Sequence, residues 1–234
     1  TYGKRKKDYY IVNGTKSWVT SGSSSDFIVL FCITNPNQGS RGVSAFIVEK
    51  DLKGLSIGKK EEKLGIRASD TTQLYLNNCK ISSENLLGKE GDGYKIAMSA
   101  LGGGRIGIAS QAVGIARASL ESAINYSSER KQFGKKINSF GATQAKLADM
   151  ATGIDAARLL VWKAAFLKDS KKKFIKESSM AKLFASEIAM KVSTECVQIH
   201  GGYGYIKEYG VERLMRDAKI TQIYEGTSEI QQMV

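Results

Sequence analysis

Histidine and cysteine are scarce in this chain of 234 residues, which contains one histidine and three cysteines. Cys32, Cys79 and Cys196 are odd in number and widely spaced, which argues against a disulfide framework and is typical of a reducing compartment. With only His200 to join them, the sequence lacks zinc-type ligand spacing. A serine–histidine catalytic triad would have to use this one histidine, which lies in a glycine-rich turn, so the sequence disfavours hydrolases.

Long apolar runs are also missing, and no stretch is long enough to span a bilayer. No signal-like segment opens the sequence, which starts at Thr1 rather than at methionine and is polar and basic over residues 1–7. We therefore expect the chain to be a piece of a longer protein, so that no targeting segment can be read from it.

Acidic residues are fewer than basic ones, 23 against 35, which gives a formal net charge of +12. Such a charge raises nucleic acid as a partner, because Lys and Arg neutralise phosphates. The basic residues stand in short clusters, such as residues 4–7, 59–60 and 171–173, without interleaved aromatics, which favours solvated faces. Small ligands that carry phosphates fit the same charge, so we expect no nucleic acid partner.

The first third of the chain has the pattern of antiparallel β-structure. Residues 9–12 and 17–20 flank Asn13-Gly14, which predicts a hairpin because both positions tolerate positive φ. The only proline, Pro36, lies in a predicted turn. Further strands are predicted at residues 27–33, 43–48, 55–57 and 72–76. A β-barrel or sandwich over residues 1–87 follows.

Beyond Gly91 the sequence changes to alanine-rich stretches with apolar residues at helical spacing. These stretches predict long helices at residues 94–128, 144–169 and 175–200, and a helical bundle domain over residues 88–234. The predicted fold class is therefore α+β, a β-domain followed by an α-helical bundle.

A glycine-rich motif over residues 102–107 matches the dinucleotide fingerprint G-x-G-x-x-G. That fingerprint requires a preceding strand and a βαβ unit, whereas helix is predicted on both sides of this segment. We interpret these glycines as a kinked helix or a site of close helix packing.

One carboxylate stands in a short loop before a predicted final helix, in the segment Ile223-Tyr224-Glu225-Gly226-Thr227-Ser228-Glu229-Ile230-Gln231. Ser228 with Gln231 fits a capping box, which would end the loop at a helix N-terminus. Gly226 removes a side chain that would crowd a ligand. Glu225 is thus a candidate general base, although an acidic residue before a helix also serves the helix dipole and its cap.

This loop resembles the catalytic loop of the acyl-CoA dehydrogenases. Four other segments match motifs of that family in order: Asn13-Gly14-Thr15-Lys16-Ser17-Trp18-Val19-Thr20, Gly104-Arg105-Ile106-Gly107, Glu129-Arg130-Lys131-Gln132-Phe133-Gly134 and Gln198-Ile199-His200-Gly201-Gly202-Tyr203-Gly204-Tyr205. The chain is most similar to the short-chain and short/branched-chain members. The family fold has an N-terminal helical domain, a middle β-domain and a C-terminal helical domain, and this sequence begins within the middle one.

The resemblance implies FAD-dependent α,β-dehydrogenation of a short-chain acyl-CoA to trans-2-enoyl-CoA, in fatty-acid or branched-chain amino-acid catabolism. Glu225 would remove the α-proton while the β-hydrogen leaves as hydride to flavin N5, and burial would raise the basicity of this carboxylate. Relatives of the isovaleryl type keep the base at the position of Gly104, and this chain has the reverse arrangement. The resemblance also implies an electron-transfer flavoprotein as electron acceptor, a homotetramer, and a location in the mitochondrial matrix of a eukaryote or the cytoplasm of a bacterium.

Site residues follow from the same resemblance. The implied substrate contacts are Arg105, Tyr224 and Gly226. The implied cofactor contacts, from the flavin ring to the adenosine half and including a pyrophosphate site for a neighbouring subunit, are Trp18, Thr20, Arg130, Phe133, Gln198, Gly201, Gly202, Thr227 and Glu229.

Several of these residues also have an interpretation without a ligand. A strand tryptophan such as Trp18 is usually part of a core. Arg130 with Phe133 reads as the end of a long helix at a glycine, where a cation favours the helix dipole. Gly201 and Gly202 fit an ordinary interhelical turn.

Three positions depart from the pattern of the family. Ser21, Gly102 and Gly141 stand where relatives often carry an asparagine, an acidic residue and a glutamine. The last contact to FAD is either lost or replaced by Gln144. A non-catalytic remnant or scaffold with this fold, and a basic nucleic-acid-binding protein, remain the alternative functions.

Overall fold

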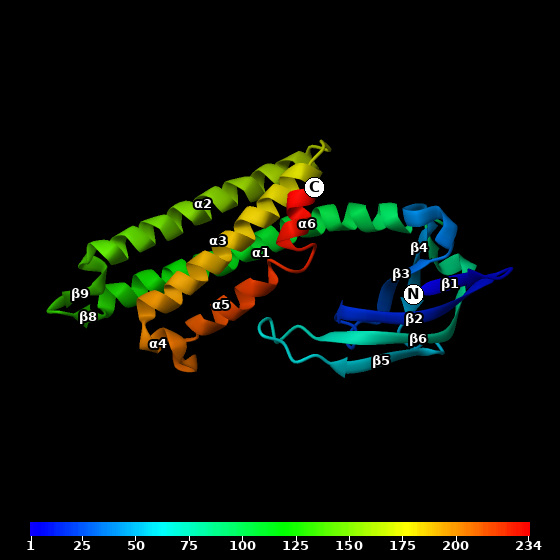
Figure 1. Ribbon diagram of the computed structural model, residues 1–234, viewed down its shortest axis with the longest axis horizontal. Coiled ribbons are helices and arrows are strands. Elements are labelled where there is room, and N and C mark those ends of the chain that lie inside the picture. The colour runs from blue at the N-terminus through cyan, green and yellow to red at the C-terminus, as the bar shows by residue number, and fades with distance from the viewer. The chain divides into compact units, whose positions relative to one another are not determined.

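A computed structural model describes residues 1–234 (Figure 1). The chain forms two compact units, one of residues 1–63 and 67–100 and one of residues 64–66 and 101–234. The predicted boundary after residue 87 falls at the end of strand β7 (Leu86–Leu87), whereas the units divide further along, within helix α1 (Gly93–Glu129).

The first unit is built on a seven-stranded sheet with the order β5-β6-β2-β1-β3-β4-β7. Its strands are β1 (Tyr2–Arg5), β2 (Tyr9–Thr20), β3 (Phe27–Ile33), β4 (Val43–Glu49), β5 (Leu55–Lys60), β6 (Thr71–Ser82) and β7. All neighbouring strands are antiparallel except β1 and β3, which pair in parallel through Tyr2 and Ile33. Strand β1 was not predicted, because it lies in the polar segment at the start of the chain. Pro36 opens a 3₁₀-helix (Pro36–Gly42) at the predicted turn.

The predicted hairpin at Asn13-Gly14 is wrong, because β2 runs through both residues without turning. The side chain of Asn13 instead accepts a hydrogen bond of 2.7 Å from the backbone N–H of Asn78 on β6. The register between the strands shifts there, from Val12 opposite Cys79 to Gly14 opposite Leu76, which leaves an extra residue on β6. The dipeptide therefore serves a β-bulge inside a long strand pair.

The core of this sheet is apolar and closely packed. Tyr10 and Phe46 are buried with their ring centroids 4.8 Å apart in an edge-to-face arrangement. Burial raises the pKa of Cys32 to about 11, and it raises that of Cys79 as well. These thiols are therefore protonated and enclosed.

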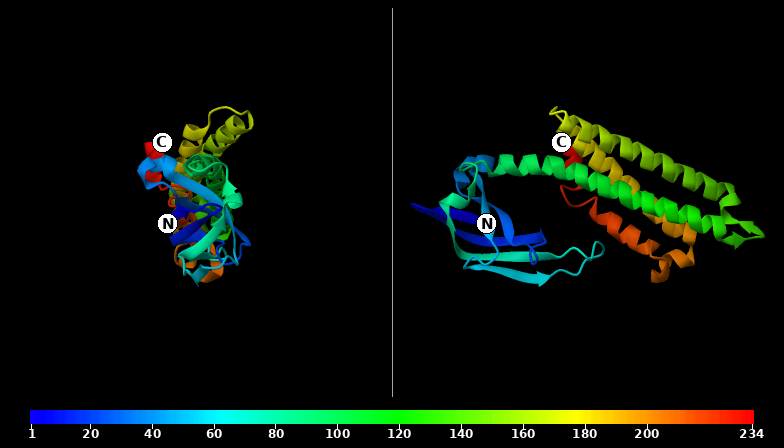
Figure 2. Two further views of the ribbon diagram at one scale, coloured as in Figure 1. Left: turned by 90° about the vertical axis from the view of Figure 1, so that its right-hand side faces the viewer. Right: turned by 180° about the vertical axis from the view of Figure 1, so that it is seen from behind.

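The second unit is a bundle whose long helices are α1, α2 (Gly141–Asp169) and α3 (Ile175–His200), followed by α4 (Gly202–Tyr205), α5 (Val211–Ile220) and α6 (Ser228–Met233) (Figure 2). The three long helices confirm the predicted bundle and, with the sheet, the α+β fold class. A two-stranded hairpin of β8 (Lys131–Gln132) and β9 (Lys135–Lys136) joins α1 to α2. None of the helices combines the length and apolar character that crossing a membrane requires.

Small side chains dominate the interior of this bundle. Its buried cluster includes ten alanines, Ala109, Ala112, Ala116, Ala123, Ala157, Ala164, Ala181, Ala185, Ala189 and Ala218. Helices with small facing residues approach closely. The glycines of residues 102–107 lie inside α1, in agreement with their interpretation as helical residues.

We predict that Phe46→Ala destabilises the first unit by about 3–5 kcal/mol, because removal of the ring leaves a cavity that the surrounding side chains cannot fill. Chemical unfolding followed by circular dichroism measures this change. Phe27→Ala is the matched control, because Phe27 is exposed on the neighbouring strand and its truncation should change the free energy of unfolding by only about 0.5 kcal/mol. Equal losses in the two variants would contradict the assignment of Phe46 to the core.

Candidate active site

The loop between α5 and α6 holds Glu225 in an unusual backbone conformation. Glu225 has φ +56° and Gly226 has φ +94°, so two successive residues take positive φ. Such a conformation is disfavoured for glutamate and persists only when the surroundings hold it. The side-chain amide of Gln231 donates to the carbonyl oxygens of Glu225 and Gly226, at 3.0 and 2.9 Å, and Lys182 Nζ donates to the Gly226 oxygen at 2.7 Å.

The predicted capping box of Ser228 and Gln231 is wrong. Thr227 is the N-cap residue of α6, and the Ser228 hydroxyl donates to Glu187 on α3 at 3.0 Å. The amide of Gln231 is directed back to the carbonyl oxygens of the loop instead of to the helix start. Glu229 is exposed beside the Thr227 side chain, and the hydrogen bond from that hydroxyl lowers the pKa of its carboxyl.

Two cations accompany the Glu225 carboxyl, which is half-buried. Burial raises its pKa, and the positive charges of Arg105 and Lys182 oppose that rise. Arg105 is buried on α1 and its Nη1 donates to Ser179 Oγ on α3 at 3.1 Å, while its Nε is buried without a hydrogen-bond partner. The structure therefore brings a carboxylate of raised basicity and a buried guanidinium into one site.

The carboxyl group of Glu225 packs directly against α1. A Cβ atom placed on Gly104 would lie 2.4 Å from Glu225 Oε2, so the absence of a side chain there makes room for the carboxylate. Tyr224, the preceding residue, donates its hydroxyl to the side chain of Gln111 on α1, and burial raises its pKa. Gly102, one of the departures from the family pattern, is buried, and a Cβ atom there would lie 2.7 Å from Ile175 Cδ1.

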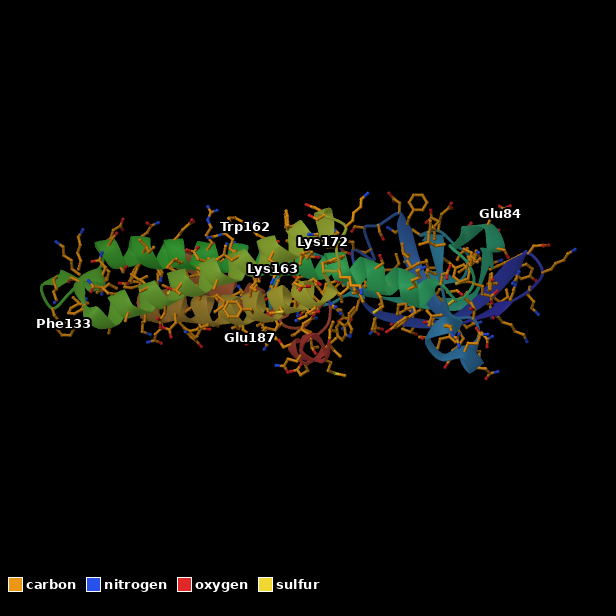
Figure 3. The ribbon with its side chains drawn as sticks, turned by 90° about the horizontal axis from the view of Figure 1, so that it is seen from above. Glu84, Phe133, Trp162, Lys163, Lys172 and Glu187 are labelled. Atoms are coloured by element: carbon orange, nitrogen blue, oxygen red, sulfur yellow. The ribbon has the colours of Figure 1, made fainter.

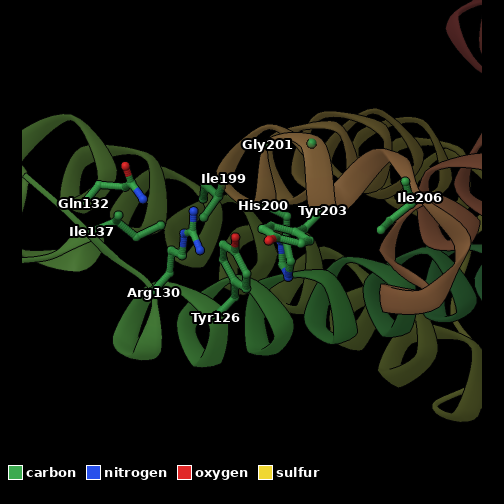
Figure 4. A pocket seen from close by; sticks show the side chains of 10 residues that line it. Tyr126, Arg130, Gln132, Ile137, Ile199, His200, Gly201, Tyr203 and Ile206 are labelled. Atoms are coloured by element: carbon green, nitrogen blue, oxygen red, sulfur yellow. The ribbon is translucent and has the colours of Figure 1, made fainter.

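A second group of predicted residues surrounds a cavity of about 480 Å³ at the other end of α3 (Figure 4). Its lining residues are Tyr126, Arg130, Gln132, Ile137, Ile199, His200, Gly201, Gly202, Tyr203 and Ile206. The guanidinium carbon of Arg130 lies 5.3 Å from the centre of the Tyr203 ring. Gly201 has φ +61°, and a Cβ atom on Gly201 or Gly202 would meet nothing within 4 Å, so the backbone is open to a ligand there. Gln198 is exposed one turn earlier.

The single histidine of the chain lies beside this cavity. Its ring stacks on Tyr126 with centroids 4.2 Å apart, and burial lowers the pKa of His200. The Nδ1 atom lies 2.8 Å from the carbonyl oxygen of Cys196, and Nε2 lies 3.4 Å from Ser122 Oγ. A backbone carbonyl thus stands where a catalytic triad requires a carboxylate.

The segment after α1 forms a hairpin instead of a helix end. Helix α1 ends at Glu129, and Phe133 and Gly134 are the two turn residues between β8 and β9, with φ +52° and +78°. The predicted ending of the helix at this glycine is therefore wrong, because Gly134 provides the positive φ of a two-residue turn. Phe133 is 91% exposed at the tip (Figure 3). Gln144, the proposed replacement for a cofactor contact, is exposed in the first turn of α2.

Trp18 and Thr20 lie in the first unit, near the end of β2. Trp18 sits at a second register shift, between Lys16 and Val19, with φ +60°. Its indole is 71% exposed, which excludes the core interpretation of this residue within its sheet. Thr20 is exposed as well, and Ser21 donates its backbone N–H to the carbonyl oxygen of Asp70 at 3.0 Å.

Sequence reasoning missed Lys182 and Gln231 as parts of the site. The spacing indicated that Lys182 faces the interior of the bundle. It lies four residues after Ser178, three before Ala185 and four before Ser186, and these three residues are buried on α3. A lysine on the small-residue stripe of a helix is a core position by periodicity alone. Gln231 carried no comparable signal, because its role depends on the path of the loop.

Comparison with known proteins matches both units. The model of the C-terminal domain of acyl-CoA dehydrogenases matches residues 91–234, and the model of the middle domain matches residues 1–79. An acyl-CoA dehydrogenase of Bacillus subtilis (strain 168) is 53% identical over 98% of this chain and 61% of its own length. The mitochondrial short-chain specific acyl-CoA dehydrogenase of Mus musculus is 52% identical over 100% of this chain and 57% of its own length.

Among solved structures, butyryl-CoA dehydrogenase from Megasphaera elsdenii superimposes with a TM-score of 0.98 at 50% identity, over 100% of this chain and 61% of that one. The chain spans about 60% of the length of the curated relatives that it matches. On these matches, the chain belongs to the acyl-CoA dehydrogenase family.

Proposed function

We propose that the protein containing this chain catalyses α,β-dehydrogenation of short-chain acyl-CoA thioesters with FAD, and that Glu225 is the base. The proposal rests on the half-buried Glu225 carboxyl, which packs against Gly104 in a loop of positive φ. Burial raises the pKa of this carboxyl. A carboxylate that water solvates fully is a poor base for the weakly acidic α-carbon of a thioester. Partial burial destabilises the ionised form and so strengthens its affinity for that proton.

The residues present fit FAD in two places. Trp18 offers an exposed aromatic ring on a strand, which suits a planar ligand. Arg130 and the open backbone of Gly201 and Gly202 offer a cation and close approach, which suit a phosphate and its nucleoside. Members of the family depend on FAD, and when bound it supplies the acceptor for the hydride that leaves the β-carbon.

Binding of the thioester falls to residues around the base. Tyr224 and Gly226 flank Glu225 in the sequence. The positive charge of Arg105 acts on the Glu225 carboxyl, and the buried Nε of Arg105 has no hydrogen-bond partner. We assign substrate contacts to these three residues, and cofactor contacts to Thr20, Phe133, Gln198, Thr227 and Glu229. Glu225 then takes the α-proton, while the substrate and cofactor residues around it keep water away from the reacting carbons.

The bundle also bears an exposed apolar stripe, which supports a homotetramer. Leu159, Trp162 and Phe166 on α2 are 62%, 62% and 66% exposed and lie at helical spacing. Figure 3 labels Trp162 on this helix. Such surfaces are enriched where protein copies meet. We further propose an electron-transfer flavoprotein as electron acceptor, and a mitochondrial or bacterial cytoplasmic location according to the source.

The base assignment predicts that Glu225→Gln in the natural full-length protein abolishes anaerobic bleaching of the flavin by butyryl-CoA, because an amide keeps the shape but cannot accept the proton. The loss should reach at least about a thousandfold, and binding of FAD and acyl-CoA should stay near the parent level. Stopped-flow absorbance and equilibrium titration measure the two quantities. Glu121→Gln, at an exposed glutamate on α1 outside the site, is the control, and normal turnover by Glu225→Gln would remove Glu225 as the base.

The packing of Glu225 against Gly104 allows a second test with the base moved. Gly104→Glu combined with Glu225→Gly should recover part of the rate, because the carboxylate would enter the space that the first one leaves. Recovery should be incomplete, since small errors in geometry cost about a hundredfold. A double variant no faster than Glu225→Gly alone would reject the exchange and leave the first test unaffected.

Arg130 should bind a phosphate of the cofactor of a neighbouring copy. The residues beside Glu225 and those beside Arg130 lie toward opposite ends of α3, where the eighteen residue steps from Lys182 to His200 span about 27 Å. Arg130→Ala should therefore reduce flavin content and assembly together, both measured on one preparation by absorbance and size-exclusion chromatography. Arg117→Ala, an exposed arginine on the same helix, is the control; full flavin content and unchanged assembly in Arg130→Ala would leave Arg130 as a helix-end cation.

Substrate preference should favour short acyl chains. We expect a higher kcat/KM for butyryl-CoA or 2-methylbutyryl-CoA than for palmitoyl-CoA, because the extra methylenes need a longer pocket. Steady-state kinetics with matched CoA thioesters measures this ratio. A higher value for the long chain would contradict the short-chain assignment while leaving the chemistry of Glu225 in place.

A further inference from the structure

Lys182 is fully buried on α3, with 0% of its surface exposed. Lysine is almost never enclosed unless it is paired, because burial removes the hydration of its charge. Burial lowers the pKa of Lys182 to about 8. The position lies on the stripe of small residues that faces the rest of the bundle, where an apolar side chain would fill the same volume without this penalty.

The ammonium group of Lys182 is directed at the loop that carries Glu225. Its Nζ donates to the Gly226 carbonyl oxygen at 2.7 Å, and Gln231 Nε2 reaches the same oxygen at 2.9 Å. One helix before the loop and one helix after it thus hold the same carbonyl. The peptide that follows Glu225 is therefore fixed from both sides, together with the positive φ of Glu225.

Four charged groups influence the Lys182 ammonium. Glu187 on its own helix favours the charged form, as do Glu225 and Glu229 around the loop, while Arg105 on α1 opposes it. In return, Lys182 and Arg105 both favour the ionised form of Glu225. Lys182 therefore acts on the base through both geometry and charge.

We propose that Lys182 is a positioning residue for Glu225, which fixes the backbone of the loop through the Gly226 carbonyl and keeps the base ionised through its positive charge. This inference rests on the proposed role of Glu225 as the base. The hydrogen bond and the positive charge of Lys182 can be tested separately, because a neutral donor can hold the Gly226 carbonyl but cannot supply the charge.

The sign of the charge effect is fixed by the direction of the pKa shifts. Glu225 works as a base only when ionised, so activity is lost as pH falls through its pKa. Lys182 lowers that pKa, and its removal must raise it. The acid limb of the rate profile should therefore move to higher pH when the charge of Lys182 is removed.

The experiment compares Lys182→Met and Lys182→Gln with the natural full-length protein, by the rate of flavin bleaching with butyryl-CoA across a pH series. In Lys182→Met we expect the plateau rate to fall about 10- to 100-fold, since a displaced base loses its alignment, and the acid limb to move upward. In Lys182→Gln, whose amide can still donate to Gly226, the limb should move in the same way with a smaller fall in rate. Lys191→Met, an exposed lysine on the same helix, should leave both unchanged.

Thermal unfolding gives a readout that does not depend on turnover. Lys182→Met should unfold at the same or a higher temperature, because it removes a buried charge while Gln231 still satisfies the Gly226 carbonyl. An unshifted acid limb in both variants would overturn the charge contribution, and a parent-like plateau rate in Lys182→Met would overturn the positioning contribution. If Lys182→Met fails to fold, the acid limb of Lys182→Gln decides alone; if the parent itself never bleaches, it is the proposed function that fails.

Discussion

The conformation of two consecutive residues, Glu225 and Gly226, is the constraint on which the site depends. Positive φ at a glutamate is disfavoured, and the carbonyl oxygens of both residues are held by side chains from α3 and α6. Without those hydrogen bonds the loop would relax to other conformations and the carboxyl group would leave Gly104. A functional side chain needs packing and supporting hydrogen bonds of this kind to stay in one geometry.

The composition of the bundle makes these contacts possible. Alanine, serine and glycine line the buried faces of α1 and α3, so that long side chains such as Arg105 and Lys182 find room between closely packed helices. Each of these cations is buried, and each favours the ionised form of Glu225. Burial and charge therefore oppose each other at the Glu225 carboxyl, and their balance sets its proton affinity.

The sequence predicted the elements with strong periodicity and missed those that depend on long-range contacts. The helices at residues 94–128 and 175–200 were recoverable because a 3.6-residue period repeats over many turns. The hairpin at Asn13-Gly14 was predicted in error, because the same dipeptide serves a turn or a bulge and only the pairing with β6 distinguishes them. Conversely, the hairpin at Phe133-Gly134 was missed because its strands have two residues each.

The site shows the same difference between what local sequence patterns predict and what long-range contacts determine. Glu225 was identified from its motif, whereas its loop is held by Lys182, 44 positions before Gly226, and by Gln231, 6 positions after Glu225. The capping box failed for this reason, because it requires the Gln231 side chain to accept from the backbone N–H of the N-cap residue, whereas its amide donates to the loop carbonyls. Local patterns locate the candidate base, and tertiary contacts decide how its side chain is held.

The three enclosed cysteines have a practical consequence. Cys32, Cys79 and Cys196 are buried and burial raises the pKa of each thiol, so thiol-directed reagents will find almost no thiolate to attack. A cysteine introduced at the tip of the β8–β9 hairpin, as in Phe133→Cys, would then be the single reactive thiol in this chain. A fluorophore attached there would report on the surroundings of the hairpin without removal of any native cysteine.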